Sequence, residues 1–211
     1  MAKQAGLGDN LYFNGYDISN DTQTVNIGMP SPLLDVTGID KSAHERLYGP
    51  RDGAIDFSVF FNDAALKAHV ALKGLPSTDI QVMYLRGTTL GNPAAAQVAK
   101  QIGYDPQRGA DGSLIMSVTT KANLYPTEWG QTLTAGKRTD TVATAPATGV
   151  DFTDVTTSFG MAAYLQVFSF AGTSATMTIQ DSADNAAFAN ITGLSAFTAA
   201  TGITVQRIET D

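Results

Sequence analysis

The sequence predicts a mainly β protein, with antiparallel sheets and one packed α-helix, divided into two domains. Three observations support this fold class. Many short segments alternate apolar and polar residues with a period of two and are bounded by turn residues. One stretch, residues 63–73, spaces its apolar residues as a helix does. Residues 132–149 are small and polar, which is typical of a linker and places the division near residues 136–149.

The first element expected is a β-hairpin that turns at Asn14-Gly15, a dipeptide favoured in two-residue hairpin loops. The strand before it is residues 10–13, and Tyr16 and Ile18 follow it. The residues before Leu11 are expected to form an N-terminal arm. This opening segment lacks the apolar stretch of a secretion signal.

A long charged loop, residues 35–52, comes next and is too polar to lie in a core. After Asp52-Gly53 the chain predicts a strand, because Ile55, Phe57, Val59 and Phe61 fall on one face. The loop carries the candidate contact residues of the chain, which are Asp35, Asp40, Lys41, His44, Glu45, Arg46, Arg51 and Asp52.

The helix predicted near residues 63–73 has Asn62 or Asp63 as its cap and ends at Gly74-Leu75-Pro76. Leu66 and Val70 form an apolar pair at i and i+4. Strands are expected at 80–86, 97–104 and 113–122; a helix is the alternative for 97–104. The segment Glu128-Trp129-Gly130 closes the first domain, which is assigned to residues 1–138.

The second domain, residues 139–211, is expected to be a small Ig-like or jelly-roll-like β-sandwich, because short strand signals recur about every ten residues. Residues 158–170 are apolar on both faces, so we expect them to lie centrally in a sheet. Further strands are expected at 175–180, 188–191, around 197 and at 203–208. The chain stops at Asp211 just after a strand, so we expect either a missing final hairpin or a sheet completed by a neighbouring edge.

The loop and its flanks resemble the major tail tube protein of long-tailed, lambda-like bacteriophages (siphoviruses). The resemblance is carried by Asp35-Val36-Thr37 before the loop, by GPRDGAIDF at 49–57, by FSVFFN at 57–62 and by VMYLRGT at 82–88. It covers roughly residues 7–135. The phrase IQDSADNAAFANITG at 179–193 resembles β-sandwich modules appended to phage virion proteins.

The resemblance implies a tail-tube-type antiparallel β-sandwich or barrel that assembles as stacked, hexameric rings. It implies a virion protein of the phage tail, assembled in the host cytoplasm, with DNA passing through the tube without specific binding. The implied partners are other copies of the chain, the tape measure protein, and the tail terminator and tip proteins. The candidate contact residues of loop 35–52 are then expected to join successive rings.

The distribution of charge agrees with a passive conduit. Up to Arg138 the chain has 13 acidic and 12 basic residues, a net charge of −1; after it there are 7 acidic residues and one base, Arg207, a net of −6. The second domain therefore lacks the clustered Lys and Arg of a nucleic-acid grip. A rival interpretation is a surface-exposed decoration or receptor-binding protein whose second domain holds host glycan. Images of the purified protein separate the two, since the first predicts rings or tubes.

An enzyme is the least favoured class, because the sequence shows no catalytic constellation. The chain has no Cys, and His44 and His69 are its only histidines, so neither thiol chemistry nor a histidine-rich metal site is expected. Asp181, Asp184 and Asn185 are interpreted as a turn rather than a calcium site. We expect no cofactor, no metal and no membrane partner, since no apolar run approaches the ~18 residues of a membrane span.

Overall fold

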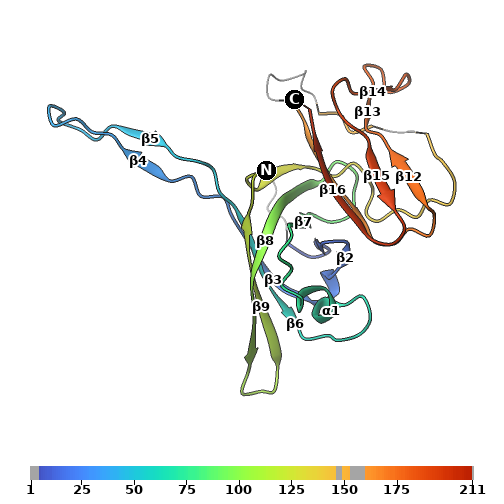
Figure 1. Ribbon diagram of the computed structural model, residues 1–211, viewed down its shortest axis with the longest axis horizontal. Coiled ribbons are helices and arrows are strands. Elements are labelled where there is room, and N and C mark those ends of the chain that lie inside the picture. The colour runs from blue at the N-terminus through green and yellow to red at the C-terminus, as the bar shows by residue number, and fades with distance from the viewer. Residues whose placement is uncertain (1–4, 146–148, 153–159, 211) are drawn as a thin grey trace.

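The computed structural model describes residues 5–145, 149–152 and 160–210. It consists of a curled sheet, a protruding arm and a C-terminal part, residues 160–210 (Figure 1). All its strand pairs are antiparallel, and the described residues contain one α-helix, which confirms the predicted fold class. No helix in this described part is long and apolar enough to cross a membrane.

The main sheet has eight strands in the order β2-β1-β7-β8-β9-β6-β3, with β10 paired to β8. The predicted Asn14-Gly15 turn joins its first two strands, and the segment 97–104 is strand, not helix. The strands are β1 (Asn10–Phe13), β2 (Tyr16–Asp17), β3 (Thr22–Gly28), β6 (Ala54–Phe60), β7 (Ile80–Leu85), β8 (Pro93–Arg108), β9 (Leu114–Ala122) and β10 (Glu128–Gln131).

The sheet curls on itself, so that β1 and β3 lie near each other although they stand almost at opposite ends of the strand order. The inward side chains of the strands fill the space between them, as period-two patterning requires. Ile55, Phe57 and Val59 are buried as predicted, whereas Phe61 lies beyond β6 and is 40% exposed. The largest fully buried side chains of this core include Leu11, Phe13, Ile18, Ile55, Leu72, Ile80, Val59, Val82 and Val118.

The helix is shorter than predicted: α1 spans Ala68–Leu72 and not residues 63–73. Leu66 has a φ of 62°, which no helix accommodates, and Lys67 is extended. The first helical amide, Ala68 N, donates to the Asp21 carboxylate at 3.1 Å, although Asp21 comes from the short 3₁₀ turn η1 (Ser19–Asp21). A tertiary contact therefore sets the start of this helix, in place of the local cap expected at Asn62 or Asp63.

The long loop is also more regular than predicted, because it contains a two-stranded ribbon of β4 (Leu33–Asp35) and β5 (Arg46–Tyr48). We call residues 30–52 the arm. It extends far from the sheet (blue to cyan in Figure 1). The prediction that these residues lie outside a core is confirmed.

In the C-terminal part, strands pair two by two: β11 (Ala162–Val167) with β16 (Thr204–Glu209), β12 (Ser174–Met177) with β15 (Phe197–Ala200), and β13 (Gln180–Asp181) with β14 (Ala189–Asn190). Ala163, Phe197 and Ile208 form its small buried core. The prediction of a central strand at 158–170 is wrong for the described residues of that segment, since β11 pairs only with β16 among them. Apart from the buried Ala163, the apolar residues of β11 are half-buried, and residues 158 and 159 lie outside the described ranges.

Candidate assembly surface

The arm is fixed at its root by two backbone hydrogen bonds. Gly49 N donates to Pro32 O at 2.7 Å, and Asp52 N donates to Pro30 O at 3.1 Å. Both prolines lie in the outgoing segment between β3 and β4 and lack amides, so the bonds at these positions come from amides of the returning segment only. The two halves of the arm therefore leave the sheet side by side.

Asp35, the last residue of β4, organises the tip of the arm. Its carboxylate accepts hydrogen bonds from the Thr37 hydroxyl and from Thr37 N, and His44 Nδ1 lies 3.1 Å from Asp35 Oδ2. Glu45 N in turn donates to Thr37 Oγ1 at 2.9 Å. The hydrogen bond from the Thr37 hydroxyl is the main reason that the pKa of Asp35 is lowered from its usual value. The tip therefore has a defined shape although all these side chains face solvent.

The structure brings some of the predicted contact residues together and separates others. Asp35, His44 and Glu45 meet at the tip, and Arg46 lies opposite Asp35 in the ribbon. Arg51 and Asp52 lie at the root, near the sheet. All eight candidate contact residues are exposed, including Asp40 and Lys41 in the turn at the end of the arm.

The ribbon also exposes large apolar side chains, which the sequence analysis did not include among its candidates. Leu33 lies opposite Tyr48, and Leu34 lies opposite Leu47. Because neighbouring residues of a strand point to opposite faces, each face of the ribbon carries one apolar pair. Each of these four side chains is more than half exposed, with Tyr48 at 81%, and Ile39 at the tip is fully exposed. The signal was present in the sequence as two apolar dipeptides on either side of the charged segment.

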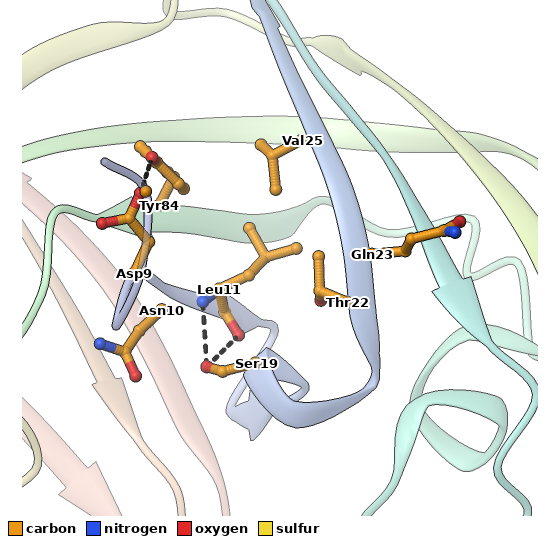
Figure 2. A pocket seen from close by; sticks show the side chains of 9 residues that line it. Asp9, Asn10, Leu11, Ser19, Thr22, Gln23, Val25 and Tyr84 are labelled. Atoms are coloured by element: carbon orange, nitrogen blue, oxygen red, sulfur yellow. Dashed lines mark hydrogen bonds between the residues drawn. The ribbon is translucent and has the colours of Figure 1, made fainter. Parts of the chain in front are cut away.

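A cavity of about 210 Å³ lies between β1 and β3 (Figure 2). Its polar side chains have hydrogen-bond partners within the subunit: the Tyr84 hydroxyl donates to Asp9, and Ser19 Oγ accepts from Leu11 N at 3.0 Å. Arg86, which does not line the cavity, places its Nη1 3.3 Å from the same Asp9 oxygen. Burial is the main reason that the pKa of Tyr84 is raised, so its phenol remains a donor. The cavity thus lies between two strands of the curled sheet that do not pair with each other.

The other polar residues singled out by sequence have structural roles. His69 lies in α1, its ring centroid 4.6 Å from that of Phe61 and its Nδ1 3.0 Å from the Tyr104 hydroxyl. Asp184 accepts hydrogen bonds from Ala186 N and Ala187 N at 2.9 Å, which confirms the predicted turn. These bonds, with Ala187 first, lower the pKa of Asp184 to about 2. No group of three or more His, Cys, Asp or Glu that would suit a metal is found within residues 5–145, 149–152 and 160–210.

Comparison with known proteins gives structural similarities at low sequence identity. No family model and no curated protein sequence matches the chain. A chain in the virion of a native gene transfer agent particle aligns with a TM-score of 0.49 and 13% identity, over 62% of this chain and 99% of that one. A chain of the anti-feeding prophage baseplate aligns with a TM-score of 0.41 and 12% identity, over 61% and 97%. The Dit protein of phage SPP1, described as a hub of the adsorption apparatus, aligns with a TM-score of 0.35 and 11% identity, over 93% of this chain and 78% of that one.

Proposed function

We propose that this protein is a structural subunit of a phage tail that polymerises through its arm into stacked rings forming a tube. The observation that carries the proposal is the apolar surface of the arm, which stands outside every core of the subunit. Apolar side chains exposed on both faces of a narrow ribbon are stabilised when another molecule covers them. A second copy of the chain is the partner that a self-assembling subunit supplies.

The sheet supports the same proposal through its open edge. The edge strand β3 pairs with β6 on one side, and no strand of the described residues pairs with its other side. Unpaired edges bind further strands readily, and a closed ring of subunits removes such edges. The arm then provides contacts between rings and the sheet edge contacts within a ring, as the resemblance to tail tube proteins implies. In that assembly the tape measure, terminator and tip proteins and the DNA are the further partners.

The charge of the subunit is consistent with a conduit. The candidate contact residues of the arm comprise four acids, three permanent bases and one histidine, so the arm has both signs of charge available for self-pairing. The first 138 residues have a net charge of −1, so they do not favour retention of phosphates by counterion release.

The test is to remove the arm without disturbing the sheet. Residues 33–48 are replaced by Asn-Gly, so that Pro32 and Gly49 flank a two-residue turn and keep their hydrogen bond. We expect the wild-type chain to form tubes in negative-stain images. The armless chain should be folded by circular dichroism, should sediment as species no larger than a single ring, and should form no tubes. Tubes formed by the armless chain would contradict the proposal.

A milder pair of variants separates apolar contact from bulk hydrophobicity. Leu34→Ser with Leu47→Ser removes one apolar pair from the ribbon, whereas Leu124→Ser removes an 83%-exposed leucine from another surface. We expect the ribbon variant alone to raise the concentration needed for assembly. Equal effects of the two variants would show that the arm has no special role.

A further inference from the structure

One buried cation lies at the junction between the sheet and the C-terminal part. Arg207 in β16 is the only base after Arg138 in the sequence, and its side chain is 8% exposed. It contacts groups on both sides of the junction. Its Nη1 lies 2.7 Å from Glu209 and its Nε donates to the Tyr164 hydroxyl at 3.1 Å, while its Nη2 lies 3.5 Å from Glu128 in β10.

The surroundings of this arginine fix both its charge and its plane. The guanidinium carbon lies 3.6 Å from the ring centroid of Tyr125, a distance at which cation and π face attract. Burial opposes its charge, but the hydrogen bonds with Glu209 and Tyr164 and the charge of Glu128 together outweigh burial, so the pKa of Arg207 is raised. Burial and a hydrogen bond to Glu128 raise the pKa of Tyr164, so this phenol remains a donor. A charge held in this way tolerates few orientations of its partners.

Gln166 makes a second polar contact. It lies in β11, the strand paired with β16, two residues after Tyr164. Gln166 Oε1 accepts from Gly15 N at 2.7 Å, and Gln166 Nε2 donates to Tyr12 O at 3.3 Å and to Gln81 O at 3.2 Å. In the reverse direction, Gln81 Nε2 donates to Gln206 O at 3.1 Å. One amide therefore bonds three backbone groups of the sheet, which a sliding or rotated C-terminal part would leave unbonded.

The junction also includes an apolar contact. Phe168 packs edge-on against Tyr12 with ring centroids 5.0 Å apart, beside Leu85 and Ala94. Apolar contacts are not directional, so this patch holds the parts together without selecting one angle. The directional contacts are centred on Arg207 and Gln166, with the hydrogen bonds from Gln81 to Gln206 and from Tyr164 to Glu128 beside them.

We propose that Arg207 and Gln166 lock residues 160–210 in one orientation on the sheet, so that the two parts move as a single rigid body and not as two domains on a linker. Arg207 acts as a positioning residue, since it sets where the C-terminal part sits without itself contacting another molecule. This inference concerns the single chain and holds whether or not the chain forms tubes.

Hydrogen exchange at Gly15 tests the lock. Gly15 is buried and its amide donates across the junction, so its exchange reports separation of the two parts. Arg207→Met keeps most of the volume and removes the charge. Arg138→Met is the matched control, because Arg138 pairs with Asp140 where both side chains are about half exposed. Peptides spanning the β1–β2 turn are compared with peptides of the β6–β9 ladder by mass spectrometry.

We expect Arg207→Met to speed exchange at the turn about tenfold or more, with the β6–β9 ladder unchanged, and Arg138→Met to leave both as in the wild type. Unchanged exchange at the turn, or an equal rise in both regions, would overturn the inference. If Arg207→Met does not fold, Glu128→Gln gives the same measurement, because it removes the charge on the sheet side and leaves the pair of Arg207 with Glu209. For this variant too, unchanged exchange at the turn or an equal rise in both regions would overturn the inference.

Discussion

Replacing Gly15 by alanine should separate the sheet from the C-terminal part, for two independent physical reasons. Gly15 has a φ of 82°, a conformation that costs a residue with a Cβ about 1–2 kcal/mol. A Cβ built on Gly15 also lies 2.1 Å from Ile203 Cγ2, so the neighbouring side chain or its strand must move. Overpacking of this kind costs about 1–3 kcal/mol. We therefore expect Gly15→Ala to lower the free energy of unfolding by about 2–5 kcal/mol.

A double-mutant cycle isolates the steric part of this cost. Ile203 is 38% exposed, so Ile203→Ala alone should cost about 1 kcal/mol, less than the burial of a whole side chain. In the double variant the clashing methyl is gone and only the backbone cost of Gly15→Ala remains. The double variant should then lose about 1–3 kcal/mol less free energy of unfolding than the two single variants lose together.

Urea unfolding followed by fluorescence and circular dichroism measures all four corners of the cycle. Gly112→Ala is the matched control, since Gly112 has a φ of 88° and a Cβ there would meet nothing within 4 Å. It should show the backbone cost alone, about 1–2 kcal/mol. Additive effects of Gly15→Ala and Ile203→Ala would refute the close approach of the two parts.

Four further predictions concern the core, the pH response and the assembly. Gln97 is fully buried, accepts a hydrogen bond from Thr127 and donates one to Thr120. Gln97→Ala should therefore lower the free energy of unfolding in urea by about 2–4 kcal/mol, and a loss below about 1 kcal/mol would contradict this account. Burial raises the pKa of Tyr12 from the ordinary tyrosine value of 10.0 to about 12. The stabilisation from Tyr12 is therefore complete below pH 10 and is lost as the pH rises towards 12, because the unfolded state ionises first. The melting temperature of Tyr12→Phe should therefore fall less over this range than that of the wild type, and equal slopes would count against it. Reversing Arg46 and Arg51 to Glu should weaken stacking while changing subunit stability by no more than about 0.5 kcal/mol, and stacking of the wild type should itself weaken as salt is raised. Arg51→Glu alone is the cleaner test because Arg46 lies opposite Asp35, and full-length tubes of the double variant at wild-type concentration would remove these charges from the interface. Fluorescence anisotropy with a short labelled duplex should show no binding at physiological salt, whereas salt-sensitive binding with a Kd of ~10⁻⁴–10⁻⁶ M would contradict a passive conduit.

The strands of the sheet were predictable because their signal is local. Alternation with a period of two marks β6, β7 and β9 whatever they pair with, and Asn14-Gly15 marks the first turn. The helix was overestimated because its start depends on Asp21, a residue 47 positions from Ala68 that no local pattern connects with it. Strand order and the curl of the sheet are tertiary properties of the same kind.

The sequence predicted that loop 35–52 lies outside a core but not the apolar chemistry of its ribbon, and the contact role of the loop stays a prediction. Charged residues drew attention to the loop, yet the structure adds an apolar pair on each face of its ribbon. The junction was missed altogether. Its sequence signal was a single arginine, Arg207, in a segment otherwise free of bases, and its partners Tyr125 and Glu128 lie about 80 residues earlier in the chain.

The narrowness of the arm has a mechanical consequence for any polymer joined by it. A ribbon of two strands has little stiffness of its own, and the root hydrogen bonds of Pro30 and Pro32 join the two halves of the arm to each other and not to the sheet. Strain between neighbouring copies would therefore concentrate in the arms and leave the eight-stranded sheet undeformed. A tube built in this way would bend at the arms between rigid subunits. Its persistence length would then depend more on the stiffness of the ribbon than on the packing of the core.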